Sequence, residues 1–133
     1  MLSSPVSALD FGSSRRAAVL FDAPASSAQK VAVVSAGYPL EKIISTQGWI
    51  KVRDETGALA WIEADILENK RTLLVTHDLA AALDKPLDTA TVRFKVQRGV
   101  MLTPVAPMES GWIKVRHASG QEGYMRVRHL WGL

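Results

Sequence analysis

Three histidines, His77, His117 and His129, are the side chains of this 133-residue chain best suited to metal binding or to proton transfer near neutral pH. No two of them stand four positions apart, and the chain has no His-Glu-x-x-His motif. Cysteine is absent, which excludes disulfides, thiolate metal sites and cysteine nucleophiles. We therefore expect no metal centre and no cofactor.

Acidic side chains and nucleophiles also lack the arrangements that catalysis needs. Asp22, Asp54 and Glu55 fall in expected loops or turns, without an evident partner acid. The sequence has no Gly-x-Ser-x-Gly elbow, no phosphate-binding loop and no dinucleotide fingerprint. These patterns predict that the chain is not an enzyme, which leaves basic and aromatic side chains as candidates for binding.

Basic side chains are concentrated in the second half of the chain. Residues 14–69 hold six basic and seven acidic side chains, whereas residues 70–133 hold ten and five, and Asp10 completes the net charge of +3. The late basic group predicts contact with an anionic polymer or with peptide carboxylates, and the alternative is a solvated strand face. The group consists of Lys114, Arg116, His117, Arg126, Arg128 and His129.

These candidates belong to a repeat. Residues 48–53 and 111–116 are the same hexamer, Gly-Trp-Ile-Lys-Val-Arg. Each copy precedes a polar turn with glycine and then an aromatic-aliphatic pair, which is Trp61-Ile62 in one case and Tyr124-Met125 in the other. An identical hexamer in a matching context indicates one small module present twice.

Strand patterns dominate the first copy. Its short apolar runs end at turn residues, and none reaches the length of an ordinary helix. Residues 63–65 suit a single 3₁₀ turn, after which a last short strand begins at Ile66. The expected strands are residues 17–21, 31–34, 40–45, 49–53 and 58–62.

The second copy is expected to repeat this order. Residues 72–76 are matched to the strand at 17–21. Residues 79–83, Leu-Ala-Ala-Ala-Leu, are expected to form a loop with one helical turn, because alanine and leucine favour helix. The remaining expected elements are strands at 92–96, 100–105, 112–116 and 124–125, a 3₁₀ turn at 126–128 and a final strand at 130–131.

Alternation along the hexamer separates core from candidate surface. Its Ile and Val face the core, so Trp49 and Trp112 face the other way with the Lys and Arg. The two tryptophans are candidate stacking platforms for a sugar or a proline-rich peptide, or they cover one end of the module or the contact between modules. Trp61 and Tyr124 are expected in or near the core, with the Tyr124 hydroxyl at the rim.

The order of these motifs resembles the bacterial SH3-like domain. The matching stretches are SAGYPLEKIISTQGWIKVRDETGALAWIEADIL and QRGVMLTPVAPMESGWIKVRHASGQEGYMRVRHLWGL, and the resemblance covers residues 15–133. It implies an all-β fold of two tandem SH3-like small β-barrels, each of five strands, at residues 15–69 and 70–133, after a flexible N-terminal segment at 1–14. Ala60 and Tyr124 depart from the family, which usually has Gly and Trp there.

The resemblance also implies a non-catalytic binding module that recognises cell-wall peptidoglycan or peptide ligands. A protein–protein adaptor, or a targeting partner of a wall hydrolase, is one alternative. A basic barrel that binds nucleic acid is another, but the first half of the chain is slightly acidic and an aromatic-basic RNA-binding motif is absent.

A periplasmic or otherwise exported location is expected from the same resemblance. The segment Met1–Ser14 lacks the basic and apolar regions of a signal peptide and would fit a mature exported chain behind a start codon. No run of about 20 apolar residues is present, so no membrane span is expected.

The groove that the resemblance implies would be bordered by residues 22–29. Phe21, Tyr38 and Trp49 are expected to line one side of it. The full set of candidate ligand-binding residues is Phe21, Tyr38, Trp49, Trp112, Arg116, Tyr124 and Arg126.

Overall fold

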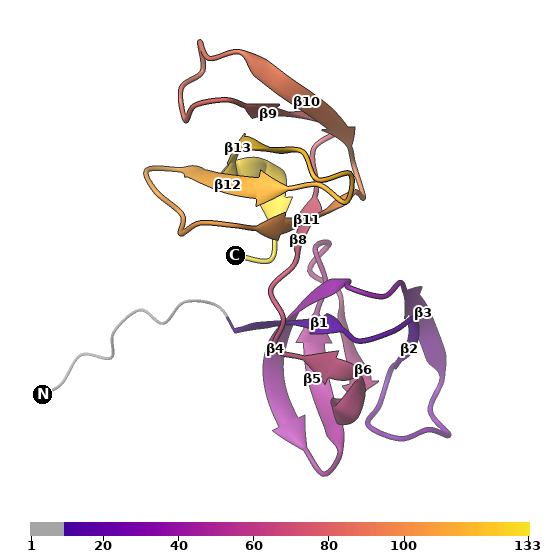
Figure 1. Cartoon of the computed structure of the whole chain (residues 1–133). Helices are drawn as coiled ribbons and strands as arrows, with labels where there is room; N and C mark the ends of the chain where they lie inside the picture. Colours follow the sequence, from indigo (N-terminus) through magenta and orange to yellow (C-terminus); the bar gives the residue numbers. More distant parts are fainter. Residues whose placement is uncertain (1–9) are drawn as a thin grey trace, which may run out of the picture.

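A computed structural model describes residues 10–133 (Figure 1). Over these residues the chain forms fourteen short strands in two seven-stranded antiparallel sheets, and its helical structure is limited to two 3₁₀ turns of three residues. No helix in the described range is long and apolar enough to cross a membrane. The fold is therefore all-β, with one sheet in each half of the chain.

Module one is the sheet of the first half, with the strand order β3-β2-β6-β5-β4-β1-β7. The turn η1 (Ala64–Ile66) joins its last two strands. The strands are β1 (Phe11–Ser14), β2 (Ala18–Phe21), β3 (Lys30–Val34), β4 (Pro39–Thr46), β5 (Trp49–Arg53), β6 (Leu59–Glu63) and β7 (Leu67–Glu68).

Module two has the equivalent order, β10-β9-β13-β12-β11-β8-β14. The turn η2 (Val127–His129) precedes its last strand. The strands are β8 (Leu73–Val75), β9 (Leu79–Leu83), β10 (Val92–Gln97), β11 (Met101–Pro104), β12 (Trp112–Arg116), β13 (Glu122–Arg126) and β14 (Leu130–Trp131).

Matching the two strand orders corrects the alignment of the repeat. Strand β8 corresponds to β1, not to the strand at residues 17–21, and β9 corresponds to β2. The helical turn predicted at residues 79–83 is therefore wrong. The segment pairs with β10 from Gln97↔Leu79 to Val92↔Leu83, and Ala80 and Ala82 are fully buried. Strand pairing and burial outweigh the weak helical preference of alanine.

The expected flexible segment at residues 1–14 is corrected at its end. Strand β1 lies between β4 and β7, and Ser13 and Ser14 are buried. The Ser13 hydroxyl donates a hydrogen bond to the Lys70 carbonyl oxygen at 2.7 Å, so this polar side chain is satisfied inside the fold. The earlier part of that prediction, residues 1–9, lies outside the described residues.

The number of strands also exceeds the five predicted for each barrel. Strands β1 and β7, and their equivalents β8 and β14, add two members to each sheet. In the described residues the hydrogen-bonded order runs from β3 to β7, or from β10 to β14, without a pairing between these ends. The sheets are thus shown as antiparallel sheets, without hydrogen-bonded closure into barrels.

Each module buries its own apolar cluster. The hexamer contributes Ile50 and Val52 to one cluster and Ile113 and Val115 to the other, as its alternation predicts. Trp61 and Tyr124 are half-buried and belong to neither cluster of buried residues, so of the two predicted places, in the core or near it, they take the second. The residues on both sides of each ring face inward, so the ring itself must face outward.

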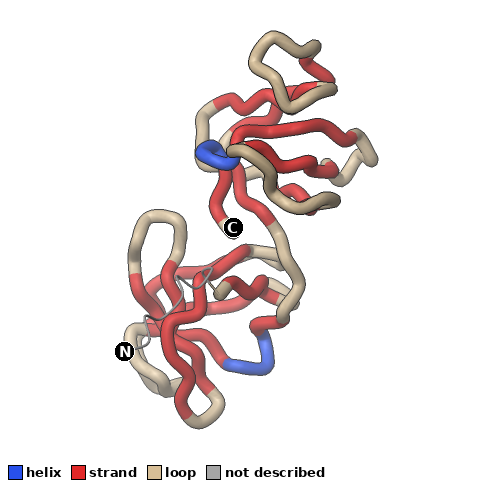
Figure 2. Tube along the Cα trace, turned by 90° about the vertical axis from the view of Figure 1, so that its left-hand side faces the viewer, coloured by secondary structure: helices blue, strands red, loops and turns tan. Residues whose placement is uncertain are grey.

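The end of the chain joins the two modules. Trp131 of β14 donates a hydrogen bond from Nε1 to the Pro39 carbonyl oxygen at 3.0 Å, and its ring meets Phe11 edge to face with centroids 5.0 Å apart. The guanidinium of Arg71, in the link between β7 and β8, donates to the Gly132 carbonyl oxygen at 3.2 Å and so holds the chain end against the link. Figures 1 and 2 both show the C-terminus between the modules. The two sheets are therefore docked through side chains as well as joined by the chain.

Candidate ligand-binding pocket

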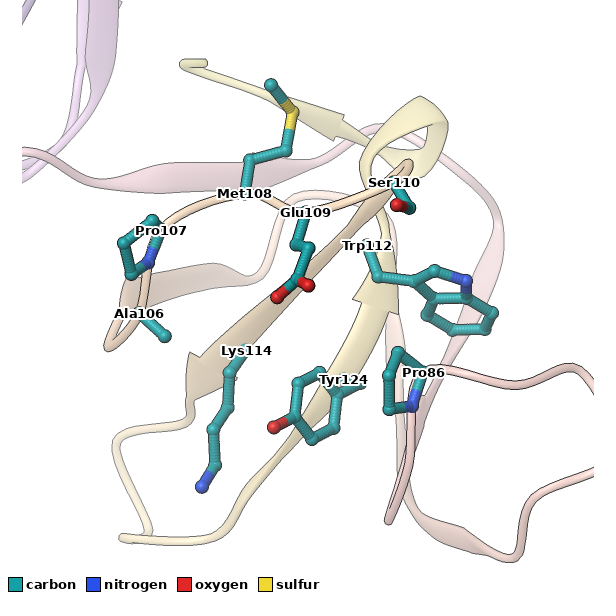
Figure 3. Close-up of a pocket in the computed structure, with 9 residues that line it drawn as sticks. All are labelled: Pro86, Ala106, Pro107, Met108, Glu109, Ser110, Trp112, Lys114 and Tyr124. Atoms are coloured by element: carbon teal, nitrogen blue, oxygen red, sulfur yellow. The ribbon is translucent and has the colours of Figure 1, made fainter.

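A pocket of about 500 Å³ opens on the outer face of module two (Figure 3). Figure 3 shows the Tyr124 ring between Lys114 and Pro86, with Trp112 next to Pro86. The lining combines two aromatic rings, two prolines and one side chain of each charge. The lining residues are Pro86, Ala106, Pro107, Met108, Glu109, Ser110, Trp112, Lys114 and Tyr124.

Strands β12 and β13 position the floor of this pocket. Their register pairs Lys114 with Tyr124 and Trp112 with Arg126. Side chains of directly opposed residues lie on the same face of a sheet, so these four form one outward-facing group. The Lys114 ammonium lies 5.8 Å from the centroid of the Tyr124 ring. The floor therefore offers an aromatic surface with a cation at its edge.

Two loops form the walls. The first, residues 84–91, is closed by a hydrogen bond from the Asp84 amide to the Thr91 carbonyl oxygen at 2.9 Å and presents Pro86. The second, residues 105–111, ends in a tight turn in which Ser110 and Gly111 have φ of 51° and 84°. Two positive φ values in a two-residue turn are typical of a type I′ hairpin. This turn brings Glu109 opposite Trp112.

Three of the six residues of the basic group, Lys114, Arg116 and Arg126, are engaged in ion pairs. Arg116 lies 2.6 Å and Lys114 3.8 Å from the carboxylate of Glu122, and the hydrogen bond from Arg116 is the main cause that lowers the pKa of Glu122. Arg126 lies 2.5 Å from Asp88. Of the candidate residues Arg116, Arg126, Trp112 and Tyr124, only the two aromatic ones line the pocket, together with Lys114. The basic group is therefore not a patch of free cations.

His129 of this group stacks on His77, which lies outside the group. The rings of His77 and His129 lie 4.2 Å apart at an interplanar angle of 15°. Burial lowers the pKa of His129, and the nearby His77, Arg128 and Arg126 lower it further. In the described residues no group of three or more His, Cys, Asp or Glu side chains is placed to hold a metal ion.

Module two is expected to lose stability as the pH falls from about 6.5 through the range in which His129 of the folded chain gains its proton. The unfolded chain binds a proton there near the ordinary histidine pKa, whereas folding lowers the pKa of this group. The unfolded state therefore binds more protons in this window, and stability falls as the pH falls. Urea midpoints at pH values across the window would measure the effect. A His129→Gln variant should lose much of this pH dependence, and an equal dependence in both proteins would contradict the prediction.

Module one carries a different arrangement on its outer face. Phe21 and Trp49 meet edge to face with centroids 5.5 Å apart, and Phe21 is paired with Trp61 across β2 and β6. A hollow of about 390 Å³ beside Trp49 is lined by Gly48, Trp49, Glu63, Ala64 and Asp65. Two of the three residues predicted to line a groove, Phe21 and Trp49, are thus brought together.

The third predicted residue, Tyr38, lies at the junction of the modules. Its hydroxyl donates a hydrogen bond to the Glu55 carboxylate, and burial, followed by this bond, raises its pKa. Tyr38 lines a small pocket of about 140 Å³ together with Arg98 and Met101 of module two. It is therefore not brought to the face that carries Phe21 and Trp49.

The family model of the bacterial SH3 domain matches residues 14–68 and again residues 76–132. The chain belongs to the bacterial SH3 domain family. The two matches fall on modules one and two, so each half of the chain is one bacterial SH3 domain. No curated protein sequence matches the chain.

Solved structures similar to this bacterial SH3 protein include NlpC1 from Trichomonas vaginalis, with 19% identity, a TM-score of 0.40, and coverage of 96% of this chain and 47% of that one. NlpC2 from the same organism has 17% identity, a TM-score of 0.41, and coverage of 93% of this chain and 48% of that one. An NlpC/P60 family protein from Bacillus cereus ATCC 10987 has 15% identity, a TM-score of 0.40, and coverage of 91% of this chain and 55% of that one. The chain spans about half the length of these structures.

Sequence reasoning missed the pocket walls of the second SH3 domain. Pro86, Pro107, Met108 and Glu109 line the pocket but were not candidates. One signal was available, because the stretch before the second hexamer contains two prolines, Pro104 and Pro107, whereas the stretch from 40 to 47 contains none. Proline lacks the amide that a strand needs, so this difference indicates that the strand gives way to a loop.

Proposed function

We propose that this bacterial SH3 protein is a non-catalytic module that binds a peptide of the cell wall, outside the cytoplasm, in the pocket of module two. The observation that carries the proposal is the pocket itself, which combines Trp112, Tyr124 and two prolines with the opposite charges of Lys114 and Glu109. Aromatic-lined grooves suit extended peptides. Peptides of peptidoglycan carry free carboxylates and amines, for which Lys114 and Glu109 provide partners.

The contacts of the pocket support binding rather than catalysis. A nucleophile needs a base within hydrogen-bond reach, and the base needs a third group that orients it. Among the described residues, no hydrogen bond joins two side chains of the pocket lining, and its polar groups stand apart around an apolar floor. This arrangement suits recognition of a ligand at several points.

Tyr124→Ala is expected to weaken retention on purified peptidoglycan about tenfold, because it removes the ring at the centre of the pocket floor. The duplicated fold provides a matched control in Trp61→Ala, which removes the ring at the equivalent position of module one. Sedimentation of each protein with peptidoglycan at low salt would measure retention, and circular dichroism would check that both variants are folded.

Three outcomes would contradict the proposal. The first is that the unchanged protein is not retained on peptidoglycan, and the second is that both variants lose retention equally. The third is that soluble fragments are released from the peptidoglycan during incubation, which would indicate catalysis. Capture of a partner protein through the same pocket, without retention on peptidoglycan, would instead support an adaptor. Fluorescence anisotropy with single-stranded oligonucleotides would test the nucleic-acid alternative.

A further inference from the structure

The hollow beside Trp49 in module one has a filled counterpart in module two. There the guanidinium carbon of Arg126 lies 4.1 Å from the centroid of the Trp112 ring. Asp88, from the loop 84–91, holds this guanidinium through two contacts, at 3.2 Å and 2.5 Å. In module two the face of Trp112, the tryptophan of the hexamer, is therefore covered by a cation of the same module, and Trp112 is only 6% exposed.

The loops beside the two tryptophans have the same backbone. Residues 22–29 are closed by a hydrogen bond from the Asp22 amide to the Gln29 carbonyl oxygen at 3.0 Å, as residues 84–91 are closed by their own end residues. Inside each loop, two further backbone hydrogen bonds from amide to carbonyl oxygen, of 2.8 Å and 3.0 Å, lie at equivalent positions. This match makes Ser26 the equivalent of Asp88.

The strand pairing completes the comparison. Trp49 is opposite Glu63 in module one, just as Trp112 is opposite Arg126 in module two. The position that provides the internal cation in module two thus carries a carboxylate in module one. Two residues further on, Asp65 stands where module two has Arg128. The charge around the hexamer tryptophan is inverted between the two modules.

The hollow in module one is open, and no cation among residues 10–133 lies over its tryptophan. Trp49 is half-buried, and the hollow measures about 390 Å³. Within the described part of the chain, no side chain of Lys, Arg or His lies within 4.0 Å of the carboxylates of Glu63 and Asp65. Arg15 is nearby, but it donates to the Asp65 backbone oxygen and pairs with Glu68.

We propose that the Trp49 hollow binds a cationic group of a ligand, a guanidinium or a primary ammonium, over the indole face and between the carboxylates of Glu63 and Asp65. The ligand cation takes the place that Arg126 occupies in module two. An indole is the best aromatic partner for a cation, and two carboxylates strengthen the attraction. This site lies in the other module from the pocket of the proposed function and does not depend on it.

The test uses a cation and its uncharged isostere as probes. Acetyl-arginine amide is titrated into the ¹⁵N-labelled full chain while the indole N–H signals are followed, and acetyl-citrulline amide serves as the neutral probe. We expect the Trp49 indole signal to shift with a dissociation constant of about 1–10 mM for the arginine probe, as a single exposed cation–π contact with carboxylate support implies. The citrulline probe should leave that signal in place.

Glu63→Gln should weaken binding of the arginine probe about fivefold, since it keeps the shape of the side chain and removes the charge. Glu109→Gln is the matched control, because it removes a carboxylate from the pocket of module two and should leave the Trp49 titration unchanged. The double variant Ser26→Asp, Glu63→Arg transfers the internal ion pair of module two to module one and should abolish the shift.

Equal shifts with the arginine and citrulline probes would overturn the proposal. So would unchanged affinity in Glu63→Gln, or a titration that moves the Trp112 indole and not that of Trp49. Failure of peptidoglycan retention through Tyr124 would overturn only the proposed function, because the arginine titration reports on Trp49 alone.

Discussion

Trp131→Ala is expected to uncouple the two SH3 domains and to lower the free energy of unfolding by about 2–3 kcal/mol. The substitution removes the edge-to-face contact with Phe11 and the hydrogen bond from Nε1 to the Pro39 carbonyl oxygen. Differential scanning calorimetry should show one cooperative transition in the unchanged protein and two in the variant, because each module retains its own buried cluster.

Trp131→Phe separates the two contributions at this junction. Phenylalanine keeps an aromatic ring against Phe11 but loses the donor to Pro39 and part of the indole, so a smaller loss of about 1 kcal/mol is expected. A single transition in Trp131→Ala, at an unchanged temperature, would contradict the role given to this side chain. Two transitions in the unchanged protein would contradict the docking of the modules.

Gly123→Val is expected to destabilise module two by about 3 kcal/mol. An ideal Cβ at this position would lie 2.9 Å from the Ala82 Cβ and 3.1 Å from the Leu83 carbonyl oxygen. Strands β13 and β9 approach so closely that a larger side chain must push the backbone of β9 away. Urea unfolding, followed by tryptophan fluorescence, would measure the loss.

Ala60→Gly provides the comparison, because Ala60 occupies the position of Gly123 in module one. There the methyl group is accommodated and buried, so its removal is expected to cost only about 1 kcal/mol. The departure from the family pattern at Ala60 is thus a packing difference between the modules. A Gly123→Val variant as stable as the unchanged protein would show that β9 yields to the added side chain.

The duplicated hexamer made much of the fold predictable. Its alternation placed Ile50 and Val52 in the core, and the repeated context fixed the strand–turn–strand order around it. Prediction failed where local preference and long-range pairing disagree. Leu79–Leu83 reads as helical by composition, and the hydrogen bonds that make it a strand come from β10, which lies beyond the loop 84–91.

The binding faces were less predictable than the strands. The alternation showed that Trp49 and Trp112 face away from the core, but not what covers each ring. The Trp112 ring is covered by Arg126, and Arg126 is held by Asp88, which lies 38 positions before it in the chain. Such a contact has no local signature. Trp61 was expected in or near the core because an aromatic residue beside an aliphatic one is common there. It is half-buried, and alternation within β6 directs its ring to the outward face.

The hydrogen bond between Trp131 and Pro39 holds the two domains together, and it therefore determines how long a ligand must be to reach both candidate binding faces. With the domains docked, the separation between the Trp49 face and the Tyr124 face is constant, and a ligand that reaches both loses little additional freedom at the second contact. We therefore expect affinity to rise sharply with ligand length once a chain spans that separation. Shorter fragments would bind each face independently and weakly, and Trp131→Ala would replace this threshold with a gradual dependence on length.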